Sequence, residues 1–126
     1  METEHFEALV VEALDSLPDI IRSKMDNVAV EVRPLADTET LHSVKAANPM
    51  NLLGIYQGIP FNRRGPWYGN VIPDRILLFQ KPIEARCRTE EAVKRLVREV
   101  LIHEIGHYYG LNEAELRQLE RSADTS

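Results

Sequence analysis

Residues 103–113 read HEIGHYYGLNE and carry the most informative pattern in this chain of 126 residues. On an α-helix, His103 and His107 would lie on one face about one turn, ~6 Å, apart, so both imidazoles can reach a single zinc ion. Glu104 would lie on the same side and can contact a water at that ion without itself being a ligand. The pattern therefore predicts a zinc clamp of two histidines with Glu104 as the general base.

A third ligand is expected just beyond this helix. Gly110 lets the chain turn sharply, and Glu113 follows it three residues later. We predict Glu113 as the third ligand, because a carboxylate is an accepted ligand of zinc. An ordinary role for Glu113, as an acid in the first turn of the next helix, stays open. Glu115 and Glu120 are the alternative ligands.

The motif lies at the end of a long amphipathic helix, which we expect to run from about residue 90 to 109. Thr89 supplies an N-cap and Gly110 a C-terminal stop. Apolar residues at helical spacing form a stripe along it, namely Val93, Leu96, Val97 and Val100. The same spacing reaches Glu104 and His107, so these side chains are expected on the inward face.

The rest of the chain predicts an α+β fold with a small sheet. Hydrophobic periodicity indicates an N-terminal helix, a half-buried strand, two short apolar strands and a short last helix, at residues 3–17, 28–33, 52–56, 75–79 and about 112–119 respectively. The polar segment 37–50 has room for a short helix. No repeat or second boundary interrupts the pattern, so we expect one domain covering residues 1–126.

Residues 58–73 contain three glycines and three prolines, which are too many for a regular element. A loop of this length inside a small domain is typical of a lid or a substrate rim, and an ordinary hairpin loop with a half-buried Trp67 is the alternative.

Composition narrows the choice of function. The net charge of −5 argues against a nucleic-acid partner, and the apolar runs are too short to cross a bilayer. The acidic N-terminus has no secretory signature, and the lone Cys87 excludes an intramolecular disulfide. We therefore expect a cytoplasmic protein, while its oligomeric state is left open.

Four segments together resemble the small bacterial zincin-like metallopeptidase family, whose members are minimal, metzincin-like zincins. They read LGIYQGIP (residues 53–60), PDRI (73–76), KPIE (81–84) and the HExxHxxGxxE motif at 103–113. The resemblance implies a small mixed β-sheet packed with the N-terminal helix and the HExxH helix. It also implies that the strand near 75–79 borders the cleft and pairs with an extended substrate. The chain departs from larger metzincins in having Glu113 in place of a third histidine and no methionine after Met50.

The motif and the resemblance together predict a zinc metallopeptidase whose substrate is a peptide or an unfolded protein. Glu104 would take the proton of the attacking water and pass it to the leaving amine. One alternative is another metal-dependent hydrolase of the RNA-processing type, which Glu113 and the negative charge disfavour. A second is a non-catalytic zinc-binding module for protein interaction, in which Glu104 would have no use as a base.

Overall fold

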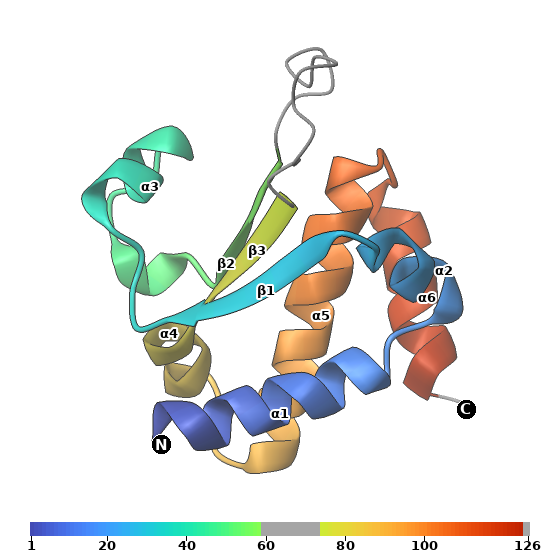
Figure 1. Ribbon diagram of the computed structural model, residues 1–126, viewed down its shortest axis with the longest axis horizontal. Helices are drawn as coiled ribbons and strands as arrows, with labels where there is room; N and C mark the ends of the chain where they lie inside the picture. Colours follow the sequence, from blue (N-terminus) through green and yellow to red (C-terminus); the bar gives the residue numbers. More distant parts are fainter. Residues whose placement is uncertain (59–73, 125–126) are drawn as a thin grey trace.

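The computed structural model describes residues 1–58 and 74–124, and it has the α+β architecture that the sequence predicts (Figure 1). In chain order the elements are α1 (Thr3–Asp15), α2 (Asp19–Arg22), the 3₁₀ turn η1 (Ser23–Met25), β1 (Val28–Arg33), α3 (Thr38–Ser43), the 3₁₀ turn η2 (Pro49–Asn51), β2 (Gly54–Gln57), β3 (Asp74–Phe79), α4 (Gln80–Ala85), α5 (Glu90–Tyr108) and α6 (Glu113–Asp124). The expected lid at 58–73 lies almost wholly outside the described residues.

The sheet is mixed, with the strand order β1-β3-β2. β3 runs parallel to β1, with Val28 opposite Asp74, and antiparallel to β2, with Gly54 opposite Leu78. The expectation that the strand at 75–79 borders the cleft is therefore wrong. Both sides of β3 are already hydrogen-bonded to neighbours, and β2 is the edge strand that lies nearest α5.

The central place of β3 follows from its side chains, which are apolar on both faces. Ile76 and Leu78 enter the main core, whereas Leu77 and Phe79 enter a second cluster beneath α3. Figure 1 shows α3 on one side of the sheet and α5 on the other. A strand covered on both faces loses the alternation of apolar and polar residues that marks a half-buried strand.

α5 forms the centre of the main core. Four of its side chains are fully buried, namely Val97, Leu101, Ile102 and Ile105. α1 crosses α5 and packs its apolar stripe against it, and α6 packs alongside the C-terminal half (Figure 1). The predicted N-cap is confirmed, because the Thr89 hydroxyl accepts the Ala92 N–H at 3.1 Å.

Several helices differ from the expectation: α2 was not predicted, and α6 continues to Asp124. α1 ends at Asp15, two residues before the predicted end, where the Ser16 hydroxyl donates to the Ala13 carbonyl. α4 was not predicted, since Pro82 argues against a helix; here it lies in the first turn, where no intrahelical acceptor is available for an N–H. Among the described residues, no helix combines the length and apolar character needed to cross a bilayer.

Candidate metal centre

The end of α5 and the start of α6 form a tight corner at Gly110. Leu111 N–H donates to the Gly106 carbonyl at 2.8 Å and Gly110 N–H to the His107 carbonyl at 3.1 Å, which is a Schellman cap. Gly110 has φ of +82°, the left-handed region that favours glycine. This corner brings the first residue of α6, Glu113, back towards the histidines of α5.

Glu113 contacts both histidines of the motif. Its Oε2 lies 3.4 Å from His103 Nε2, and its Oε1 lies 3.1 Å from His107 Nε2. Two ligands of one tetrahedral zinc ion, each bound at about 2.0–2.1 Å, are separated by roughly 3.3 Å. Two imidazole nitrogens and one carboxylate are ligands that zinc commonly takes. The two distances from Glu113 to the Nε2 atoms also match the separation of two ligands on one zinc ion.

In this structure the three side chains do not surround one point at which an ion could sit. Within residues 1–58 and 74–124, no three His, Cys, Asp or Glu side chains surround a common point at which a metal could be held. The imidazole ring centres of His103 and His107 are 5.9 Å apart, and the rings are tilted by 50°. The fit to zinc thus rests on donor chemistry and on the two contacts of Glu113.

The alternative ligands take other places. Glu115 forms the predicted capping box, in which its N–H donates to Asn112 Oδ1 at 2.8 Å and its carboxylate accepts the Asn112 N–H at 3.3 Å. Glu120 lies 2.8 Å from His103 Nδ1, which is the other ring nitrogen from the one that faces Glu113. These contacts of Glu115 and Glu120 therefore do not involve the Nε2 atoms that face Glu113.

His107 lies at an open edge of α5, contrary to the inward position that the apolar spacing suggested, and His103 lies beside it at the margin of the covered face. The side chains of His103 and His107 are 35% and 52% exposed. The fully buried positions run instead through Leu101 and Ile105, because α1, the sheet and α6 cover that side of the helix. Solvent and ligands can therefore reach the imidazoles.

Glu104 is more enclosed and is held by the edge strand. The backbone N–H of Tyr56, on β2, donates to Glu104 Oε1 at 3.0 Å. Burial raises the pKa of Glu104 above its ordinary value, against the opposing effects of this hydrogen bond and of the two nearby histidines. The motif spacing did not reveal Tyr56 as a partner of Glu104, although the residue lies in one of the segments that carry the family resemblance.

Tyr56 is itself fixed by aromatic and polar contacts. Its ring stacks on Tyr108 with centroids 4.1 Å apart, and its hydroxyl donates to Asp74 Oδ2 at 2.8 Å. Burial and this hydrogen bond raise the pKa of the Tyr56 phenol well above its usual value, so the hydroxyl stays protonated. These contacts hold β2 in place beside the motif helix.

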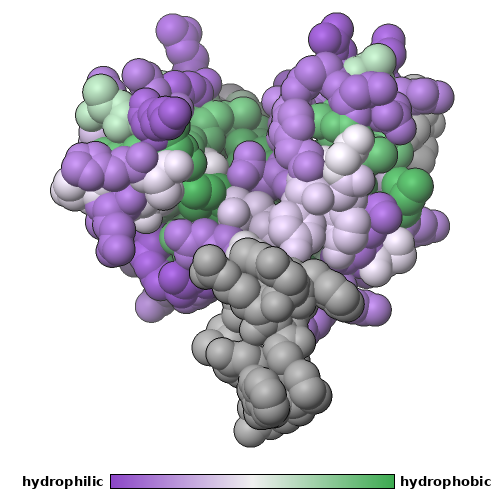
Figure 2. Space-filling model, turned by 90° about the horizontal axis from the view of Figure 1, so that it is seen from above, coloured by the Kyte–Doolittle hydropathy of each residue, from purple (hydrophilic) through white to green (hydrophobic). Residues whose placement is uncertain are grey.

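A hollow of about 350 Å³ adjoins His103 and Glu104, between β2 and α5. Its lining is mostly apolar and consists of Leu52, Leu53, Gly54, Leu96, Glu99, Val100, His103 and Glu104. Seen from above, the molecule has a notch between two lobes, and apolar side chains gather on the walls of that notch (Figure 2).

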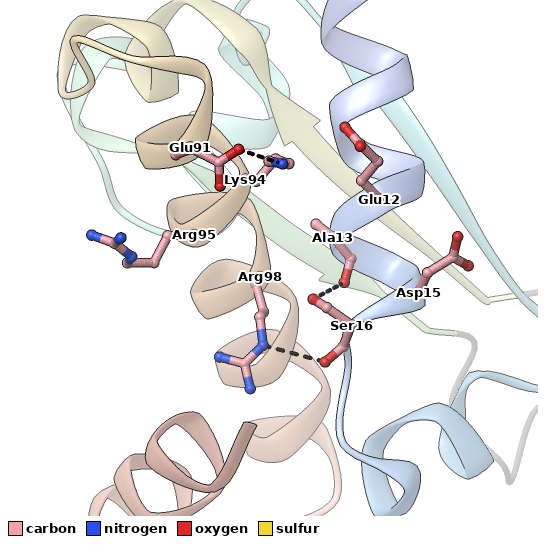
Figure 3. Close-up of a pocket in the computed structure, with 8 residues that line it drawn as sticks. All are labelled: Glu12, Ala13, Asp15, Ser16, Glu91, Lys94, Arg95 and Arg98. Carbon is pink, nitrogen blue, oxygen red and sulfur yellow. Dashed lines mark hydrogen bonds and ion pairs between the residues drawn. The ribbon is translucent and has the colours of Figure 1, made fainter. Parts of the chain in front are cut away.

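A larger hollow of about 520 Å³ lies between α1 and α5, away from the motif (Figure 3). It is lined by charges of both signs, including Glu12 from α1 and Lys94 from α5. Lys94 pairs with Glu91 at 2.7 Å, and Arg98 Nε points to the Ser16 carbonyl at 3.5 Å. Lys94 is thus paired with Glu91 and Arg98 is engaged with backbone, and no histidine lines the hollow, so the motif at the end of α5 is the stronger candidate for chemistry.

A helix that presents HExxH beside the edge strand of a small mixed sheet defines the class of zincin-like proteins. The profile of the zincin-like metallopeptidase family matches residues 25–123, from η1 into α6. The protein belongs to this family, as the resemblance of its four segments predicts. A search of curated proteins finds no match to the chain.

Proposed function

We propose that this protein is a zinc-dependent peptidase in which His103, His107 and Glu113 hold the ion and Glu104 is the general base. The observation that carries the proposal is the spacing of Glu113 from both Nε2 atoms, 3.4 and 3.1 Å, beside a carboxylate held by the edge strand. A zinc ion, when bound there, would supply Lewis-acid polarisation of the scissile carbonyl and acidify a water.

Glu104 moves the proton in this proposal. Tyr56 N–H occupies Oε1, so Oε2 is the oxygen that we assign to proton transfer. It accepts a proton from the attacking water and returns it to the leaving amine.

The substrate that we propose is an extended polypeptide lying along β2. The backbone N–H of Tyr56 faces Glu104 and not β3, so this side of the strand borders the candidate site. An extended peptide can add to a sheet edge through main-chain hydrogen bonds. Its side chains are then free to bind in neighbouring pockets. The apolar hollow between Leu53 and Val100 is suited to a medium-sized apolar side chain next to the scissile bond.

The test is cleavage of a fluorogenic peptide from an unfolded protein by the zinc-loaded enzyme. Glu104→Gln keeps the acceptor for Tyr56 N–H but cannot take a proton, so kcat should fall about 10²–10⁴-fold. Glu12→Gln, an exposed change on α1, is the matched control and should keep full activity. Activity that survives Glu104→Gln, or that resists a chelator, would contradict the proposal.

The same preparations test the two alternatives. An RNA-processing hydrolase would cleave structured RNA in a manner that depends on Glu104, and would leave the peptide intact. A non-catalytic module would bind zinc through His103 and His107 with neither activity, and would hold it in a closed set of four protein ligands.

A further inference from the structure

Glu120 lies behind His103, on the side of the ring that faces away from Glu113. Its Oε1 is 2.8 Å from His103 Nδ1, whereas Glu113 Oε2 is near Nε2. The Glu120 side chain is only 19% exposed. Its Oε1 is buried and accepts no hydrogen bond from the described part of the chain, so the close approach to Nδ1 is its main polar contact there. The charge of this carboxylate is therefore directed to the imidazole of His103.

The hydrogen-bond partner of His103 Nδ1 is the Glu99 carbonyl at 3.1 Å, and the Glu120 carboxylate lies beside this bond. A zinc ion on Nε2 would leave the proton of the neutral ring on Nδ1, where both neighbours, a carbonyl and a carboxylate, are acceptors only. The neutral tautomer with a proton on Nδ1 has its lone pair on Nε2. That is the nitrogen directed towards Glu113.

Packing between α5 and α6 fixes Glu120 in this place. Glu113, Leu116 and Glu120 are spaced by three and four residues and so share one face of α6. Leu116 on that face is fully buried and packs against Gly106 of α5. Arg98 Nη1 donates to the backbone carbonyl of Glu120 at 3.2 Å, which ties this turn of α6 to α5.

We propose that Glu120 is a positioning residue for the metal site, which holds His103 with its proton on Nδ1 and its Nε2 lone pair free for the ion. This inference rests on the metal site of the proposed function. Acceptors around the outer N–H of a ligand histidine, here the Glu99 carbonyl and the adjacent Glu120 carboxylate, fix the ring and make its other nitrogen a better donor. One face of α6 then provides a ligand, Glu113, and also the residue that positions a second ligand, because Glu120 lies beside His103.

The test measures zinc affinity by competition with a chromophoric chelator. Glu120→Ala should weaken binding about 10–100-fold, and Glu120→Gln, which keeps the size of the side chain but not its charge, should weaken it less. Gln118→Ala, an exposed change on the same helix, is the matched control and should leave the affinity unchanged.

A second measurement separates positioning from a general structural role. In protein saturated with zinc, the Nδ1 proton resonance of His103 should lie downfield because a carbonyl and a carboxylate surround it, and should move upfield in both Glu120 variants. Glu120→Gln conserves volume and keeps the test valid if Glu120→Ala fails to fold.

Unchanged affinity, an unmoved resonance, or an equal loss in Gln118→Ala would each overturn the role of Glu120. A protein that takes up no zinc would overturn this inference and the proposed function together. Zinc binding that depends on Glu120, without peptide cleavage, would support this inference and reject the proposed function alone.

Discussion

Glu104 combines a buried setting with a single backbone donor, and this makes its protonation sensitive to folding. Burial raises the pKa of Glu104 in the folded protein above the value in the unfolded chain. The folded state therefore binds this proton more tightly, and the resulting stability is fully present below the unfolded pKa. It is lost as the pH rises from there through the folded pKa.

Replacing Glu104 by Gln should consequently stabilise the metal-free protein at neutral pH, because Gln has no charge to bury and keeps the acceptor for Tyr56 N–H. The gain in free energy of unfolding should shrink towards pH 4, where the native Glu104 carboxyl is protonated. Urea unfolding in the presence of a chelator, at pH 7 and pH 4, measures it. A variant that is less stable at pH 7 would show that the native carboxylate is well compensated.

At the scale of elements, the contact between α5 and α6 depends on Gly106, the fourth residue of the motif. A Cβ added to Gly106 would overlap Leu116 Cδ2 and meet Leu116 Cγ at 3.3 Å. The absence of a side chain at this position lets α6 lie close to the motif helix. That close approach is what places Glu113 and Glu120 beside the histidines.

Gly106→Ala should push α6 outwards, lowering the free energy of unfolding by about 1–3 kcal/mol and weakening zinc binding. Adding Leu116→Ala makes space for the new methyl group, so the double variant should recover part of the zinc affinity that Gly106→Ala loses. A double-mutant cycle on zinc affinity measures this coupling. Independent, additive effects would mean that this contact does not set the position of α6.

At the scale of the whole molecule, the proposed ligands belong to two helices whose arrangement exists only in the folded state. Zinc that binds the folded protein alone stabilises it in proportion to the logarithm of its concentration, by about 2.7 kcal/mol at 100 times Kd. For a chain of this size we expect the melting temperature to rise by roughly 10 °C.

Thermal unfolding with zinc and with a chelator measures this shift, and His107→Ala is the control that should abolish most of it. An equal shift in His107→Ala would place zinc binding elsewhere in the chain.

The sequence by itself determined the local features of this protein. The strand at 28–33, the N-cap at Thr89 and the capping box of Asn112 with Glu115 all follow from residues that are near one another in the chain. The family likewise followed from a contiguous motif and three short segments. Such features are predictable because caps, turns and periodicity depend on neighbours within about one turn of helix or one strand.

Only the tertiary structure decided which strand lies at the edge and which carboxylate meets which ring atom. β3 is central because its apolar residues are covered on both faces, and its uninterrupted apolar run was the signal available for this. The open position of His107, the hydrogen bond of Tyr56 to Glu104 and the place of Glu120 had no such signal. They depend on how α5 packs against α1, β2 and α6, which are contacts between residues far apart in the chain.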